Sequence, residues 1–152
     1  MSFISLKDQL AEDLKDAMRQ GNETRKTALR LTIAAIKNAE VAAIKQLDDA
    51  DVIGVIAKQA KQRRESIEEF QKANRQDLVD KEAAELKVLE TYLPAQMSRE
   101  DVAAEARKVI EETGAKGPQD KGRVMAALMP RLAGRADGKL VNEAVTELLT
   151  SA

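Results

Sequence analysis

The chain has 152 residues, a length that suits one ordinary domain or two small ones. It contains no cysteine and no histidine, which excludes disulfides, thiolate chemistry and the usual general base near neutral pH. Aromatic residues make up only 2% of the chain and charged residues 34%, so we expect an aliphatic core inside long helices with solvated faces. The formal net charge is −1, and any basic surface must therefore be local.

Helical periodicity runs through the N-terminal part of the chain, and strand alternation is not evident there. Ser5 has the pattern of an N-terminal cap, and Gly21 is a typical helix end. Asp48 or Asp49 is expected to cap a later helix, and Pro94 ends the last one because it disfavours helical geometry in the residue before it. The four expected helices lie at about 5–20, 24–46, 49–70 and 77–92.

Each of these helices carries an apolar stripe at helical spacing. Gly54 lies inside the third helix, where glycine costs about 1 kcal/mol relative to alanine. Close approach of another helix is the simplest explanation for this glycine. The residues expected on the buried faces are Leu6, Leu10, Leu14, Met18, Leu29, Ile33, Ile36, Ala43, Leu47, Val52, Ile56, Ala60, Ile67, Phe70, Leu78, Leu86 and Leu89.

Three further helices are expected after Pro94. Ser98 and Asp137 have the pattern of N-terminal caps, and Pro118 suits a first helical position. Gly114 ends the first of the three, and the second, which Pro130 interrupts near its end, finishes at Gly134. The sequence therefore predicts an all-α protein with two units.

The first unit is a bundle-like set of four helices over residues 1–94, and the second is a small three-helix unit over residues 95–152.

Residues 116–139 are the most informative segment for function. They hold four of the seven glycines, two of the three prolines, and six basic residues against two acidic ones. Turns that let the backbone approach a partner, together with unpaired positive charge, suit contact with phosphates. We expect the contacts at Lys121, Arg123, Arg131, Arg135 and Lys139, with the backbone shaped by Gly122, Gly134 and Gly138. The alternative is that these glycines only make turns and tight packing.

Other chemistry has less support in the sequence. Glu65, Glu68 and Glu69 could offer carboxylates to Mg²⁺, but a solvated face that pairs with Lys61 and Arg64 explains them more simply. No metal or cofactor is therefore expected. The serines have no histidine to activate them, so nucleophilic catalysis has no recognisable base. Few aromatic side chains argue against stacking on single strands and favour structured RNA.

The chain resembles the GatB/YqeY family, and in particular its free-standing YqeY-like members. The resemblance covers most of the chain. It is carried by these segments: Leu29-Arg30, Lys58-Gln59-Ala60-Lys61-Gln62-Arg63-Arg64-Glu65-Ser66-Ile67, Glu85-Leu86, Tyr92-Leu93-Pro94-Ala95-Gln96, Asp120-Lys121-Gly122-Arg123-Val124-Met125, Pro130 and Gly134-Arg135-Ala136-Asp137-Gly138-Lys139.

The resemblance implies an all-α fold with two subdomains. It also implies a role like that of the C-terminal tail of the GatB component of the tRNA-dependent amidotransferase, which helps to hold tRNA without performing the transfer chemistry. We therefore expect a non-catalytic module that binds tRNA or supports glutamine-dependent amidation of misacylated tRNA. Its partners would be tRNA and an amidotransferase or aminoacyl-tRNA synthetase, and not DNA.

Two alternatives stay open. One is a protein-interaction adaptor that uses the N-terminal helices and has no nucleic-acid role. The other is a carbon–nitrogen ligase with glutamine as amido donor, as the family label suggests. The start of the chain lacks the apolar core of a signal peptide, and no run is long enough to span a membrane, so a cytoplasmic location is expected.

Overall fold

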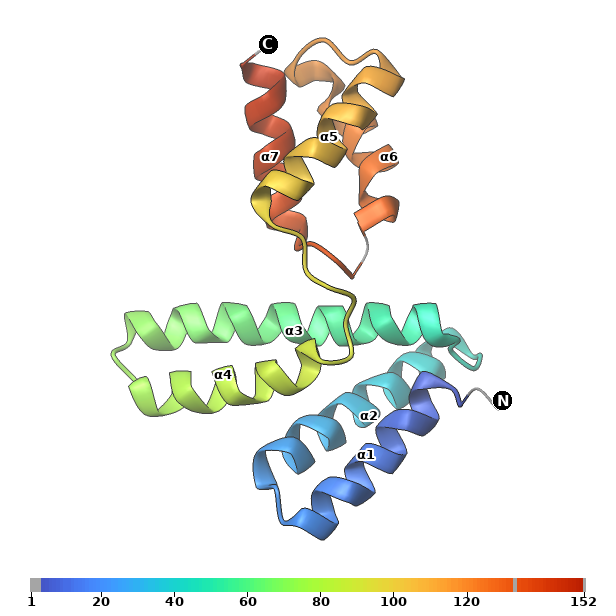
Figure 1. The fold of residues 1–152 in the computed structure, drawn as a ribbon, viewed down its shortest axis with the longest axis vertical. Coiled ribbons are helices and arrows are strands. Elements are labelled where there is room, and N and C mark those ends of the chain that lie inside the picture. Colours follow the sequence, from blue (N-terminus) through green and yellow to red (C-terminus); the bar gives the residue numbers. More distant parts are fainter. Residues whose placement is uncertain (1–3, 133, 152) are drawn as a thin grey trace. The chain divides into compact units, whose positions relative to one another are not determined.

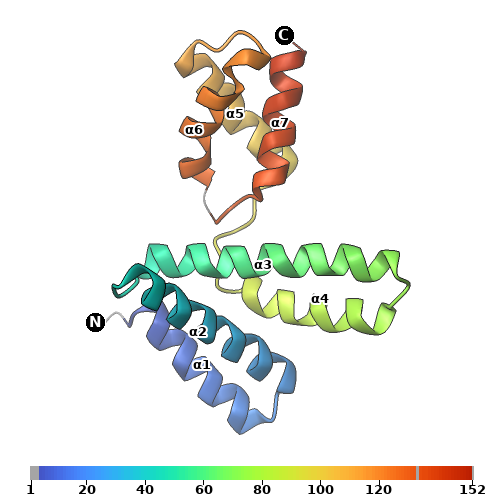
Figure 2. The ribbon, with the colours of Figure 1, turned by 180° about the vertical axis from the view of Figure 1, so that it is seen from behind.

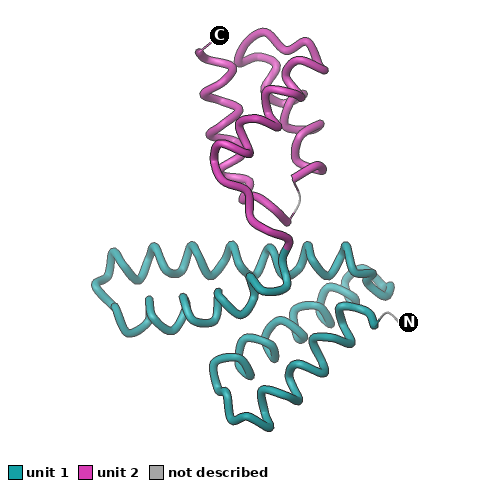
Figure 3. The backbone as a smooth tube through the Cα atoms, viewed as in Figure 1, with its two compact units in different colours: residues 1–93 teal, residues 94–152 magenta. Residues whose placement is uncertain are grey.

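The computed structural model describes residues 4–132 and 134–151. These residues form seven α-helices and one short 3₁₀ helix, with no strand among them, which confirms the all-α prediction. The chain divides into two compact units, residues 1–93 and residues 94–152 (Figure 3).

Two helix hairpins build the first unit. Figures 1 and 2 show α1 beside α2 and α3 beside α4, and α2 also packs against both helices of the second hairpin. The four helices are α1 (Leu6–Gln20), α2 (Glu23–Ala43), α3 (Asp49–Lys72) and α4 (Gln76–Glu90).

Short polar side chains cap the starts of α1, α2 and α3. The Ser5 hydroxyl accepts a hydrogen bond from the Asp8 N–H at 3.1 Å, and Gly21 ends α1 with φ 65°, so both predictions are confirmed. At α3 the cap is Asp48, whose carboxylate accepts from the Asp51 N–H in a capping box. Helix α2 ends at Ala43, three residues earlier than expected.

The core of the first unit is aliphatic, as expected, but two of its expected members are exposed. Met18 is 50% exposed and Ala17 is buried instead. The series of every fourth residue drifts by about 40° per step around a helix with 3.6 residues per turn, so its last member leaves the buried face. Ala43 is exposed as the last residue of α2. The buried core residues are Leu10, Ala17, Leu29, Ile36, Val52, Ile56, Ala60 and Leu89.

The expected close approach of a helix at Gly54 is wrong. Gly54 is exposed, and a Cβ added to it would meet no atom within 4 Å. The packing of this chain therefore does not require glycine at that position.

The second unit consists of α5 (Arg99–Thr113), a 3₁₀ turn η1 (Pro118–Asp120), α6 (Lys121–Leu132) and α7 (Gly138–Thr150). Each of the three α-helices packs against the other two around a core of valine, leucine and alanine. The buried members are Val102, Ala106, Val109, Val124, Leu128, Leu132, Val141, Ala144, Val145 and Leu149.

Most of the expected helix ends in this unit are confirmed. Ser98 forms a capping box with Asp101, Gly114 ends α5 with φ 68°, and the Asp137 carboxylate accepts from the Lys139 N–H. Pro118 begins the 3₁₀ turn rather than an α-helix. Pro130 lies inside α6, which continues to Leu132. None of the helices in the described part of the chain is long and apolar enough to cross a membrane.

Candidate nucleic-acid interface

The five basic residues predicted to contact phosphate fall at two ends of the second unit. Lys121 and Arg123 lie in the first turn of α6, whereas Arg131 lies in its last turn. Arg135 follows in the turn to α7, and Lys139 is in the first turn of α7. The rise between Lys121 and Arg131 is about 15 Å along the helix axis, so these side chains do not form one compact cluster.

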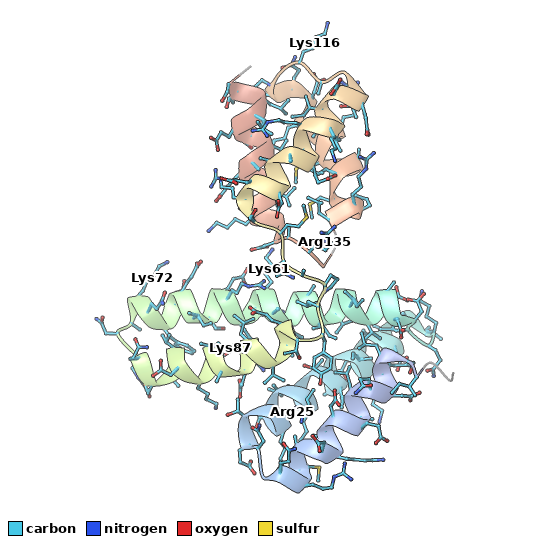
Figure 4. All side chains as sticks on the ribbon, in the orientation of Figure 1. Arg25, Lys61, Lys72, Lys87, Lys116 and Arg135 are labelled. Carbon is cyan, nitrogen blue, oxygen red and sulfur yellow. The ribbon has the colours of Figure 1, made fainter. Side chains whose placement is uncertain are left out.

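Figure 4 shows this separation through two labelled side chains of the same segment, Lys116 and Arg135, which lie at opposite ends of the second unit. We call Arg131, Arg135 and Lys139 the turn cluster, because they surround the turn from α6 to α7. We call Lys121 and Arg123 the start pair.

Two of the five cations have acidic partners in the folded chain. Arg131 donates to Glu112 of α5, with Nη2 and Oε2 2.5 Å apart. Arg123 lies 3.3 Å from Asp120. The expectation that these cations lack comparable acid is wrong for both. Arg123 pairs with Asp120, one of the two acids within residues 116–139, whereas folding brings Glu112 to Arg131 from outside that segment. The hydrogen bond from Arg131 also lowers the pKa of Glu112 below its ordinary value.

Arg135 and Lys139 differ from the paired arginines. Both are exposed, and no acidic side chain within residues 4–132 and 134–151 forms an ion pair with either. The backbone around Arg135 is fixed: its N–H donates to the Leu132 carbonyl at 2.9 Å, and its carbonyl accepts from the Met97 N–H at 2.8 Å. The turn cluster therefore presents two unpaired cations on a well-anchored turn.

The three glycines predicted to shape the backbone behave differently from one another. Gly134 has φ 77°, a left-handed conformation that favours glycine. Gly122 and Gly138 lie within helices; a Cβ on Gly122 would meet nothing within 4 Å, and one on Gly138 would only touch Met129 at 3.7 Å. Of the three, Gly134 has the conformation that needs glycine.

The whole second unit is electrically balanced, with nine basic and nine acidic residues in positions 94–152. Attraction of an anion must therefore come from the local arrangement of charge at the turn cluster rather than from the net charge of the unit.

Sequence reasoning missed a buried ion-pair cluster in the first unit. The Arg63 guanidinium of α3 is 9% exposed and donates to the carboxylates of Glu82, at 3.0 Å, and Glu85, both on α4. Arg63 lies three residues after Ala60 on the same stripe as Val52 and Ile56, so its position on the buried face could have been read from the spacing.

A second missed cluster joins α1, α2 and the end of α4. The Tyr92 hydroxyl donates to Asp13 at 2.5 Å, and Arg25 lies 3.6 Å from Asp13 and 2.8 Å from Asp16. Burial, followed by the hydrogen bond to Asp13, raises the pKa of Tyr92. Nothing in the spacing of these residues along the chain indicates their contact.

One of the carboxylates considered for a metal, Glu69, forms an ordinary surface ion pair. Arg64 approaches Glu90 of α4 at 3.8 Å, rather than the neighbouring acids expected from the sequence, and Lys72 lies 3.6 Å from Glu69. Among the described residues, no group of three or more His, Cys, Asp or Glu side chains is arranged to hold a metal ion.

Comparison with known proteins identifies relatives across nearly the whole chain. A family model described as Yqey-like protein matches residues 7–149. A protein of Kluyveromyces lactis named "Altered inheritance of mitochondria protein 41, mitochondrial" is 43% identical over 107 residues, which cover 68% of this chain and 57% of the relative. A protein of the same name from Pyrenophora tritici-repentis is 35% identical over 147 residues, covering 93% of this chain and 79% of the relative.

A third relative of that name, from Eremothecium gossypii, is 40% identical over 106 residues, covering 68% of this chain and 58% of the relative. The match thus spans less than two thirds of the Kluyveromyces and Eremothecium proteins.

The cytoplasmic location expected from the sequence is contradicted by these relatives, which are named as mitochondrial proteins. The expectation came from composition and from the first residues of the chain, and the composition of a folded helical domain carries no information on compartment. The Yqey-like family model matches residues 7–149, which are most of the chain. The chain therefore belongs to the YqeY-like family.

Proposed function

We propose that the C-terminal unit binds structured RNA, with tRNA as the expected class, through phosphate contacts at the turn cluster. The observation that carries the proposal is the pair of exposed cations, Arg135 and Lys139, which have no acidic partner among the described residues. A guanidinium and an ammonium group close together suit a phosphate, because both donate charge-assisted hydrogen bonds to its oxygens.

The proposal favours the turn cluster over the start pair. Arg123 is already paired with Asp120, and the Lys121 side chain is half-buried, so the start pair has less free charge to offer. Arg131 is held by Glu112 in an ion pair and is not counted among the free cations. Two free cations support only weak binding by themselves, with a slope of log affinity against log salt of about −2.

The role that follows is a non-catalytic one: this unit holds RNA for a partner enzyme. The process we propose is glutamine-dependent amidation of misacylated tRNA, which the sequence resemblance to the GatB/YqeY family implies. Recognition would depend on RNA shape more than on a particular base, since aromatic residues that could stack on bases form only 2% of the chain.

Titration of fluorescently labelled tRNA across a salt series, with matched double variants, tests the proposal. We expect R135Q/K139Q to weaken binding at least tenfold at low salt and to reduce the salt slope by roughly two, one for each lost phosphate contact. The control K121Q/R123Q removes the same charge from the other end of α6 and should have a smaller effect. Equal loss in both variants would place the contact elsewhere, and no binding of wild-type protein at low salt would refute the RNA role.

A further inference from the structure

One face of the α1–α2 hairpin exposes aliphatic side chains that the fold leaves uncovered. Ile44, which directly follows α2, is 92% exposed, and Val41 is 76% exposed. They are the two most exposed large hydrophobic residues in the described part of the chain. Together with Ile33, Lys37 and Glu40 they lie along one side of α2, at spacings of three and four residues. We call these five residues the α2 face.

Ile44 also has an unfavourable backbone conformation. Its φ of 53° and ψ of 42° are left-handed, which β-branched side chains rarely adopt. Helices α1 and α5 end in the same conformation at Gly21 and Gly114, the residue type that favours it. Packing among the described residues does not compensate for the isoleucine, because its side chain is 92% exposed. The turn therefore holds an apolar side chain outward as a projection.

An apolar hollow lies beside this projection on the same hairpin. It has a volume of about 170 Å³ and is lined by Leu10, Ile33 and Ile36, with Lys7, Lys37 and Glu40 around them. Lys37 and Glu40 also line the shallower surface that includes Val41 and Ile44, so the hollow and the projection are continuous. Ile36 and Ile44 are eight residues apart, about 12 Å along α2.

A projection and a hollow on one continuous face make that face complementary to itself. We propose that the α2 face binds a second copy of this chain, with the two α2 helices antiparallel around a twofold axis near Glu40. In this arrangement position 40 of one copy faces position 40 of the other, and position 36 of each copy faces position 44 of the other. Ile44 of each copy lies over Ile36 of the other and inserts its side chain into the apolar hollow, which is the isologous contact that twofold symmetry requires.

The charges on the α2 face fit the same arrangement. Lys37 forms no ion pair among the described residues, and in the antiparallel pair it lies one helical turn from Glu40 of the partner copy. The two Glu40 side chains near the axis are already compensated, because Lys7 donates to Glu40 at 2.7 Å within each copy. The contact is limited to about three turns of α2, so we expect a transient dimer with a dissociation constant of roughly 0.1 mM.

Sedimentation equilibrium of the full chain over a concentration series tests the proposal. Ile44→Asn removes the projection, and asparagine tolerates the left-handed conformation, so the fold should be preserved. We expect this variant to weaken dimerisation at least tenfold while its helical circular dichroism stays unchanged. Lys37→Glu, which places like charges across the axis, should weaken it as well.

Leu31→Asn is the matched control, since Leu31 is 51% exposed on α2 but lies about 140° around the helix from Ile44. It should dimerise like the wild type. A wild-type chain that remains monomeric at about 1 mM, roughly ten times the expected dissociation constant, would overturn the proposal. Equal dimerisation of Ile44→Asn and Leu31→Asn would overturn it too. The test contains no RNA, so its result is independent of the RNA-binding role.

Discussion

Gly54 and Gly21 differ in whether the fold needs glycine, so replacing each with alanine should change the free energy of unfolding in opposite directions. Gly54→Ala should raise the free energy of unfolding by about 0.5–1 kcal/mol, because an alanine Cβ meets no atom there and lowers the cost of forming the helix. Gly21→Ala should lower it by about 1 kcal/mol, because φ is 65° at that position. Urea denaturation of both variants measures the difference, and a destabilised Gly54→Ala would show that a contact covers this glycine.

The buried ion pair between α3 and α4 should show strong coupling in a double-mutant cycle. Arg63→Leu leaves the buried Glu85 carboxylate without its partner and should cost roughly 3–5 kcal/mol. Arg63→Leu/Glu85→Leu removes both charges together and should recover much of that loss, since apolar side chains suit this buried site. Additive effects of the single substitutions in chemical denaturation would contradict a direct Arg63–Glu85 interaction.

At the scale of the elements, Glu40 joins the start of α1, the end of α2 and the loop before α3. Its carboxylate accepts from Lys7 Nζ at 2.7 Å and from the Leu47 N–H at 2.8 Å, and these bonds lower its pKa. A lowered folded pKa contributes stability above the unfolded value of 4.5, and that stability is lost as the pH falls through the folded pKa.

Glu40→Gln should therefore reduce stability at neutral pH and flatten its acid dependence. The urea midpoint at a series of pH values measures this. An acid dependence identical to that of the wild type would mean that the Glu40 bonds do not persist in solution.

The sequence indicated the helices and their caps well, because capping is local chemistry. Ser5, Ser98 and Asp137 each bond to a backbone N–H two or three residues later, so the pattern lies within a few residues of sequence. Contacts between elements were harder to infer. Glu112 reaches Arg131 across 19 residues, and Tyr92 reaches Asp13 across 79, and no local spacing encodes either contact.

At the scale of the whole molecule, the same limit applies to the candidate site. Residues 116–139 carry a net charge of +4, but the three-dimensional structure divides those cations between the two ends of α6 and brings Glu112 of α5 to Arg131. The net charge of a segment therefore says less about where an anion can bind than the ion pairing of each side chain does. Arg135 and Lys139, which form no ion pair among the described residues, are the two cations on which the proposed RNA-binding role depends.

The most direct test of that role is a substitution that should improve binding, since damage to the fold cannot mimic a gain. Glu112→Gln releases Arg131 from its 2.5 Å ion pair, and the arginine can then add a phosphate contact to the turn cluster. Glu111→Gln is the control, because Glu111 is the exposed neighbour and has no ion pair among the described residues.

In tRNA titrations at several salt concentrations, Glu112→Gln should bind several-fold more tightly than wild type at low salt. Its salt slope should steepen by roughly one, while Glu111→Gln changes little. Unchanged or weaker binding by Glu112→Gln, or an equal gain in the two variants, would contradict phosphate contact at the turn cluster.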